Sequence, residues 1–510
     1  MHKYFKFFSE NRFLILIVLL AAALRFYGIT QAPPSLNWDE VSHGYNAYSI
    51  LKTGKDEWGK MFPLANFRAY GDYPLPLNLY LIIPFIAGLG LNEISIRLPH
   101  AILGTLTILM VFFFAFGLSK NKKFALLTSF LVAITPWYLF TSRYVIQANL
   151  SIFLLIASMA AFFNRDKYKF LSPFSIILLF LSLFAYHTTR IFSPILLLAL
   201  IFVFRKKLNL HFFLLTILFY VVFALLIINP DARARAKFVF LLNEGAITKI
   251  EEARNISKFN PLVKRLIFNR VTYFASEFSK NYIDYFSPDF LFIKGGTQYQ
   301  FSVPQTGLIY LVCLPFFYLG LWQLIKKAKA GEANEKFLLL WLILAPIPAS
   351  LTNERFAVLR ATTMLPLPEV LIAIGVFVFS NFLKNKGKII IPLFVVALLM
   401  SLEIYLNGYF KGYRINYSWA WQYGYKEVVD YAKQNYSKYD KIIVTKKYGE
   451  PHEFFLFFMP WDPNKYQNDP NLIRFYQSDW YWVDRFDKFF FVNDWQIPKM
   501  GERFVLESKK

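Results

Sequence analysis

Long apolar runs, separated by short polar segments, recur along almost the whole chain. A helix needs about 20 apolar residues to cross the hydrocarbon core of a bilayer, and about eleven runs approach this length. The first run follows Lys3, Lys6 and Arg12 and resembles a signal-peptide core. Because no small-residue cleavage site follows it, we interpret it as an uncleaved first helix. The predicted spans are 13–29, 97–118, 124–141, 150–163, 170–186, 191–204, 211–228, 307–325, 337–352, 365–382 and 389–406.

Basic clusters between the apolar runs predict the orientation of the spans. Such clusters face the cytoplasm in membrane proteins. If each cluster lies inside, the N-terminus is cytoplasmic and the odd number of spans places the C-terminus outside. The short, proline-containing run 75–90 is then a juxtamembrane or re-entrant segment on the outer side. The clusters are 120–123, 165–169, 205–207, 326–329 and 384–388.

Three long polar pieces fall on the outer side: 30–96, 229–306 and 407–510. The first two are outer loops of a transmembrane module that covers residues 1–406. The third piece has a helical pattern from Tyr425 to Tyr436 and a short β-type run at 441–445. The predicted fold class is therefore a polytopic α-helical membrane protein with a small C-terminal extracytoplasmic α/β domain, residues 407–510.

Composition supports a membrane protein and excludes several other classes. Hydrophobic residues make up 56% of the chain and charged residues 17%, against about 25% charged residues in soluble proteins. The mean hydropathy is +0.38. The net charge of +23 does not indicate nucleic-acid binding, because Lys and Arg follow the membrane topology. Cys313 is the single cysteine, which excludes an intramolecular disulfide and a cysteine-based metal site.

Two adjacent carboxylates, Asp39 and Glu40, follow Trp38 in the first outer loop. Adjacent residues of a helix point about 100° apart, so the two acids can do different jobs. One could deprotonate an acceptor hydroxyl while the other orients a partner or a metal. The alternative interpretation is a helix N-terminus that is stabilised by acidic side chains.

Arginines near the outer ends of the predicted spans form the second candidate group. Guanidinium groups bind phosphate through paired hydrogen bonds. Their outer position runs against the positive-inside trend, which favours a site for a lipid-borne phosphate. For any single arginine, the alternative is a contact with lipid headgroups. The group consists of Arg68, Arg143, Arg190 after His187, Arg233, Arg235 and Arg360.

Several motifs occur in an order that resembles the type C glycosyltransferases, in the protein-O-mannosyltransferase and aminoarabinose-transferase superfamily. The resemblance extends from about residue 10 to residue 370, and it concerns the broad bacterial branch. The motifs are Trp38-Asp39-Glu40, Gly71-Asp72-Tyr73-Pro74-Leu75-Pro76-Leu77, Arg97-Leu98-Pro99, Pro136-Trp137, Ser142-Arg143, Ala148-Asn149-Leu150, Asn281-Tyr282, 286–292, Gly307-Leu308-Ile309-Tyr310, and 346–352 with Arg360.

This resemblance implies an inverting membrane glycosyltransferase. The enzyme would move a monosaccharide from a polyprenyl-phosphate donor to an extracytoplasmic protein, lipid or glycan. Asp39 matches the family's first-loop acid, the catalytic base, and Glu40 would support it. Residues expected to bind donor phosphate or substrate are Arg68, Asp72, Arg143, His187, Arg190 and Arg360. The protein would be a multi-pass protein of the plasma membrane with an extracytoplasmic active site.

The sequence departs from the family at three positions. Gln147 stands where the family often has Glu or Asp, and Pro74 where it often has Lys. A family histidine is missing near Glu354 and Arg355. These differences weaken any metal assignment. The sequence therefore identifies no certain cofactor, and a divalent metal ion is left as a possible one. They also leave a non-catalytic relative that binds the lipid-linked sugar as an alternative. A transporter or flippase is the third class, and it is disfavoured because the spans contain almost no acids at mid-depth.

Overall fold

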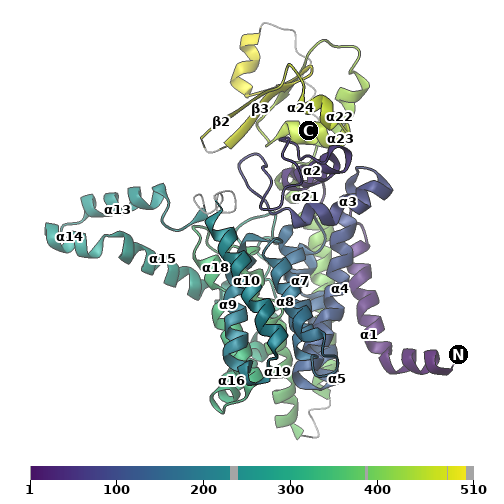
Figure 1. Ribbon diagram of the computed structural model, residues 1–510, viewed down its shortest axis with the longest axis vertical. Coiled ribbons are helices and arrows are strands. Elements are labelled where there is room, and N and C mark those ends of the chain that lie inside the picture. The colour runs from purple at the N-terminus through teal and green to yellow at the C-terminus, as the bar shows by residue number, and fades with distance from the viewer. Residues whose placement is uncertain (1, 230–238, 385–388, 479, 501–510) are drawn as a thin grey trace.

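The computed structural model describes residues 2–229, 239–384, 389–478 and 480–500. A bundle of long helices forms one layer, and a smaller layer with a β-sheet covers one end of the bundle (Figure 1). Arg233, Arg235, Lys386 and Lys388 lie outside the described residues.

The bundle helices overlap all eleven predicted spans. They are α1 (His2–Phe26), α4 (Glu93–Ser119), α5 (Lys122–Ile134), α6 (Pro136–Thr141), α7 (Gln147–Phe163), α8 (Leu171–Ser182), α9 (His187–Phe204), α10 (Leu210–Ile228), α16 (Leu314–Lys329), α17 (Ala333–Leu344), α18 (Ile347–Ser350), α19 (Leu367–Phe382) and α20 (Ile390–Asn407). Within the described ranges, five helical stretches are long and apolar enough to cross a membrane. The helical membrane fold is thus confirmed, whereas the number of eleven crossings stays a prediction.

Four of the basic clusters lie at one end of the bundle, as the predicted topology requires, whereas most of the fifth, at 384–388, lies outside the described residues. Lys122 Nζ donates a hydrogen bond to the main-chain oxygen of Glu10 in α1, at 2.6 Å. The Arg165 guanidinium lies 5.6 Å from the ring of Phe204, beside the cluster at 205–207. Asn334, near the cluster at 326–329, donates to the Leu118 oxygen at 3.0 Å. The sheet lies at the opposite end of the bundle (Figure 1).

Small residues allow two bundle helices to pack closely. A Cβ added at Gly320 in α16 would collide with the main-chain oxygen of Leu371 in α19. A Cβ at Gly375 in α19 would collide with the main-chain oxygen of Phe316. Close contact of this kind holds membrane helices together, because lipid offers no hydrophobic drive for their association.

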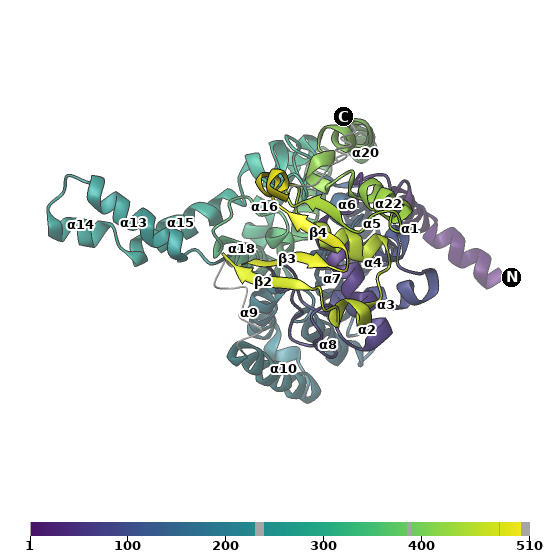
Figure 2. The same ribbon diagram turned by 90° about the horizontal axis from the view of Figure 1, so that it is seen from above.

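The two predicted outer loops contain helices of their own. The first loop holds α2 (Trp38–Thr53) and α3 (Leu77–Leu89), which lie between the bundle and the sheet layer. The second loop contains α13 (Glu244–Ile256), α14 (Pro261–Ile267) and α15 (Arg270–Asp284). These three helices form an arm that extends sideways from the molecule, as Figures 1 and 2 both show.

The C-terminal segment has the predicted α/β character. A sheet in the order β1-β4-β3-β2 has parallel pairing only between β1 and β4, within the described residues. The predicted helix at 425–436 and strand at 441–445 correspond to α22 and β1. The elements are α21 (Arg414–Asn416), α22 (Tyr425–Gln434), β1 (Ile442–Thr445), α23 (Pro451–Phe458), α24 (Pro463–Gln467), β2 (Ile473–Gln477), β3 (Trp480–Phe486) and β4 (Phe489–Val492).

The C-terminal segment and the first outer loop share one hydrophobic core. Val41 and Tyr45 of α2 belong to the same buried cluster as Phe455 of α23 and Phe489 of β4. Gly44 makes this contact close, because a Cβ there would lie 2.5 Å from the ring of Phe457. The helix that carries Asp39 therefore packs between the bundle and the C-terminal segment.

Candidate active site

A cavity with an empty volume of about 670 Å³ collects residues from distant parts of the chain. Among the predicted site residues, Asp39, Asp72 and Arg360 line it. Gln147 and Pro74, two of the positions that depart from the family pattern, also line it. The other lining residues are His43, Ile146, Tyr186, Gln298, Phe301, Glu354, Ala357 and Leu359.

The N-terminus of α2 is fixed by a capping box. The side chain of Asn37 accepts a hydrogen bond from the Glu40 amide at 2.9 Å, and the Asn37 amide donates to Glu40 Oε2 at 3.3 Å. This reciprocal pair satisfies two amides that a helix start leaves without partners. It therefore fixes the backbone position from which the side chain of Asp39, one residue earlier in the first turn, projects.

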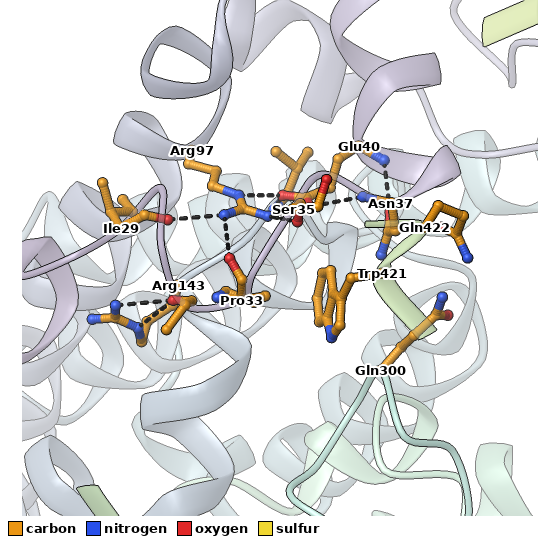
Figure 3. A network of polar contacts seen from close by, with 12 residues as sticks. Ile29, Pro33, Ser35, Asn37, Glu40, Arg97, Arg143, Gln300, Trp421 and Gln422 are labelled. Carbon is orange, nitrogen blue, oxygen red and sulfur yellow. Dashed lines mark hydrogen bonds and ion pairs between the residues drawn. The ribbon is translucent and has the colours of Figure 1, made fainter. Parts of the chain in front are cut away.

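Glu40 is fully buried and forms a two-point ion pair with Arg97 of α4 (Figure 3). Arg97 Nε lies 2.8 Å from Glu40 Oε1, and Nη2 lies 2.6 Å from Oε2. The Val145 amide also donates to Oε1, at 3.0 Å. Arg97 further donates to the main-chain oxygens of Ile29 and Pro33 (Figure 3). Glu40 therefore holds α2 against the bundle, and it does not line the cavity.

Asp39 is only half-buried and faces the cavity. The hydroxyl of Tyr70 donates a short hydrogen bond to Asp39 Oδ1. Burial, reinforced by the charge of Asp39, raises the pKa of Tyr70 well above its usual range. Tyr70 thus stays protonated and keeps the carboxylate in place.

His43 lies one helical turn after Asp39 and was not predicted as a site residue. Its Nδ1 lies 2.7 Å from the main-chain oxygen of Asp39, so Nδ1 carries the proton and Nε2 is an acceptor. Within the described residues, this buried Nε2 has no hydrogen-bond partner. Burial lowers the pKa of His43 to about 4, which keeps the ring neutral at pH 7. The i, i+4 spacing from Asp39 was the signal that could have identified it.

Arg360 and Glu354 form an ion pair at the cavity wall. Arg360 Nη1 lies 2.9 Å from Glu354 Oε2 and donates to Thr352 Oγ1 at 2.9 Å. Both side chains remain partly exposed, at 16% and 20%. Gln147, another lining residue, donates through Nε2 to the Leu75 oxygen at 2.8 Å and so holds the first loop.

The remaining predicted site residues do not line the cavity. Arg143 is 1% exposed, and its guanidinium donates to main-chain oxygens of Leu24, Tyr27, Gly28 and Ala32. Arg190 donates to the oxygens of Leu183 and Ala65. His187 Nε2 lies 2.8 Å from the Tyr73 oxygen. The Arg68 guanidinium lies 4.4 Å from the ring of Tyr481.

The cavity contains carboxylates and an imidazole, the groups that a divalent metal would need. Across the described ranges, no three His, Cys, Asp or Glu side chains of the cavity bring ligand atoms within 4.8 Å of one another. The residues thus do not form a ready metal site there, and no step below involves a metal.

A protein-family model described as dolichyl-phosphate-mannose-protein mannosyltransferase matches residues 15–232. This range covers α1, the first outer loop and the helices that follow it, and it includes Asp39 and Asp72. No curated protein sequence matches the chain.

Two kinds of solved structure are similar to the whole chain. The oligosaccharyltransferase AglB from Archaeoglobus fulgidus, in complex with an inhibitory peptide and a dolichol-phosphate, matches with a TM-score of 0.53 and 15% identity. The match covers 89% of this chain but only 64% of the archaeal protein. ArnT from Cupriavidus metallidurans, bound to undecaprenyl phosphate, matches with a TM-score of 0.51 and 11% identity. Here 88% of this chain and 85% of ArnT are covered.

Proposed function

Since the chain has the type C glycosyltransferase fold, we propose that it is a membrane glycosyltransferase with a polyprenyl-phosphate sugar as donor. The observation that carries this proposal is the cavity in which Asp39, Asp72 and Arg360 meet. A carboxylate and a guanidinium in one cavity are what an acceptor hydroxyl and a donor phosphate need. The dolichol-phosphate bound to AglB and the undecaprenyl phosphate bound to ArnT support the donor class.

In the proposed reaction, Asp39 is the general base. The acceptor oxygen attacks the anomeric carbon of the sugar, and the bond from that carbon to the phosphate oxygen breaks. The electron pair of this bond leaves with the polyprenyl phosphate, and the proton of the acceptor goes to Asp39. Because the leaving group is a stable anion, it needs no proton, and one in-line displacement inverts the anomeric centre.

The neighbours of Asp39 divide the remaining work. Tyr70 and the capping box fix the position of the carboxylate, while Glu40 and Arg97 hold α2 in place. Arg360 binds the donor phosphate. When the donor binds, its phosphate replaces Glu354 as the ion-pair partner of the guanidinium. Asp72 faces the same space and orients the sugar or acceptor hydroxyls. The positive-inside distribution of the basic clusters supports our proposal that this cavity faces the extracytoplasmic side of the plasma membrane.

A relative that binds the donor without transferring the sugar is the second candidate. It is favoured by Gln147, which lines the cavity where the family often has an acid. An amide adds no negative charge, and Gln147 is already bonded to the first loop. Donor binding without turnover would identify this case.

The test is an incubation of the purified protein with a panel of polyprenyl-phosphate monosaccharides. A transferase should release free polyprenyl phosphate when an acceptor extract is present. Asp39→Asn keeps the size of the side chain and removes its basicity, so it should lower turnover by roughly 10²–10⁴-fold with little change in donor affinity. Full activity of Asp39→Asn would contradict the assigned base. Binding of a donor without any release would favour the second candidate.

A further inference from the structure

Three metal-binding side chains meet where the C-terminal segment packs on the first outer loop. Glu57 follows α2, whereas His452 and Glu453 lie in the first turn of α23. Each offers a ligand atom, and these atoms lie within 4.8 Å of one another. All three side chains are at most 2% exposed. None of them lines the cavity described above.

The distances within this group suit an ion better than direct hydrogen bonds to the imidazole. His452 Nε2 lies 4.0 Å from Glu57 Oε1 and 3.8 Å from Glu453 Oε1. A nitrogen and an oxygen this far apart are not hydrogen-bonded. Two ligands held at about 2.1 Å in a tetrahedral zinc site are separated by about 3.4 Å. If the nitrogen–oxygen distances in the group shortened by about half an ångström, the three side chains could therefore bind one ion together.

A further carboxylate occupies the position of an outer support for the imidazole. Glu450 Oε2 lies 3.5 Å from His452 Nδ1, and the indole nitrogen of Trp480 donates to Glu450 Oε1. Metal-binding histidines usually turn their other ring nitrogen toward a carboxylate, which fixes the tautomer. Within the described residues this Nδ1 is buried without a hydrogen-bond partner, so Glu450 would have to move closer to hold the imidazole with Nε2 facing Glu57 and Glu453.

The charges of the group are only partly balanced by nearby cations. Three buried carboxylates meet here, yet the neighbouring Lys446 is already paired with Asp484. Within the described residues, Glu57 Oε2 and Glu453 Oε2 are buried without hydrogen-bond partners. Arg474 acts on Glu57 as the nearest remaining cation.

We propose that Glu57, His452 and Glu453 bind one Zn²⁺-type divalent ion that fastens the C-terminal segment to the first outer loop. One imidazole and two carboxylates are borderline ligands that suit zinc, whereas calcium and magnesium prefer oxygen alone. Because Glu57 follows α2, the ion also stabilises the helix that carries Asp39.

The experiment uses the full-length protein in detergent, stripped with a chelator and then dialysed against Zn²⁺. Elemental analysis should show one equivalent of zinc bound through this group, and zinc should raise the melting temperature. Glu453→Gln and His452→Gln should each weaken this binding by more than about 100-fold, since even outer-shell changes cost 10–100-fold. Glu427→Gln, an exposed acid on α22, is the matched control and should keep the zinc.

Asp39→Asn separates this site from the cavity, because it should retain the same equivalent of zinc. If a variant cannot be purified, a Co²⁺ titration of the wild-type protein should show the absorption bands of a nitrogen-ligated ion. Failure of the wild-type protein to bind zinc or cobalt would overturn the proposal. Unchanged zinc binding in Glu453→Gln and His452→Gln would overturn it as well. If Glu453→Gln raises the melting temperature without metal and zinc does not raise that of the wild type, Glu57 and Glu453 only share a proton, which would overturn the proposal.

Discussion

Asp39 and Glu40 are adjacent acids in opposite environments, and their variants should fail in different ways. Glu40→Gln removes one partner of a buried ion pair and leaves Arg97 without its counter-charge. Such changes cost about 3–5 kcal/mol of stability. We therefore expect Glu40→Gln to lower the melting temperature and the yield, whereas Asp39→Asn should lower only turnover. A stable but inactive Glu40→Gln protein would show that the roles of the two acids are reversed.

The arginines also divide into two groups at the residue scale. Arg360→Ala should weaken donor binding by about 10- to 150-fold, the cost of a lost charged hydrogen bond, without unfolding the protein. Arg143→Ala should instead destabilise the protein by about 3 kcal/mol or more, because several main-chain oxygens lose their donor. Equilibrium binding of a polyprenyl-phosphate sugar and thermal melting measure the two effects. The exposed Arg414→Ala is the control for both.

His43 should make the protein sensitive to acid. Its pKa is about 4 in the folded state and about 6.5 in an unfolded chain. Between these values the unfolded state binds the extra proton, so stability falls as the pH drops from about 6.5 to about 4. Across this range, the melting temperature should fall less with decreasing pH for His43→Gln than for the wild type. His211→Gln, at an exposed position, should leave the pH dependence of the melting temperature unchanged. If His43→Gln shows the same pH dependence as the wild type, the lowered pKa assigned to His43 is wrong.

The cavity residues show how far a sequence can locate a site. Asp39 and Arg360 could be predicted because charged groups at membrane boundaries are rare and match a motif. The sequence could not distinguish Arg360 from Arg143. An arginine that is free to bind phosphate and an arginine that donates to main-chain oxygens occur in the same local sequence pattern. Only the path of residues 24–32 around Arg143 decides this. His43 was missed because its i, i+4 spacing from Asp39 is only a weak signal, and its burial against the cavity is not visible in one sequence.

At the scale of elements, the contact between α16 and α19 should be the most sensitive to small additions. Gly375→Ala places a methyl group against the main-chain oxygen of Phe316, and backbone cannot move aside as a side chain can. Overpacking of this kind typically costs about 1–3 kcal/mol. We expect a lower melting temperature in detergent. Gly88→Ala on α3, where a Cβ meets nothing within 4 Å, should be neutral, and equal melting of both variants would contradict close packing.

Elements were predictable where one physical rule dominates. Apolar length located the bundle helices because lipid requires it, and a short run of β-branched residues located β1. The arm of α13, α14 and α15 was predicted only as a loop, because its helices are short and polar and follow no membrane rule. Likewise, the core that α23 shares with α2 could not be predicted, since roughly 400 residues separate them and pairing at that distance leaves no local pattern.

At the scale of the whole molecule, the predicted topology places the C-terminus outside the cell. Four of the basic clusters lie at one end of the bundle, and the sheet lies at the other. A reporter that is active only in the cytoplasm should therefore be silent when fused after Lys510. The same reporter fused in the loop at 165–169 should be active. A bright signal from the C-terminal fusion would place the cavity on the wrong side of the membrane.

The shared core between α2 and the C-terminal segment also has a consequence for the order of assembly. A ribosome adds about 5–20 residues per second, so α2 emerges about 20–80 s before α23 and the sheet exist. During that time the apolar side of α2 has no protein partner from the segment that finally covers it. Asp39, the proposed base, therefore reaches its final surroundings only when the last hundred or so residues arrive. A chain that stops early thus carries every cavity residue and still lacks the packed layer above α2.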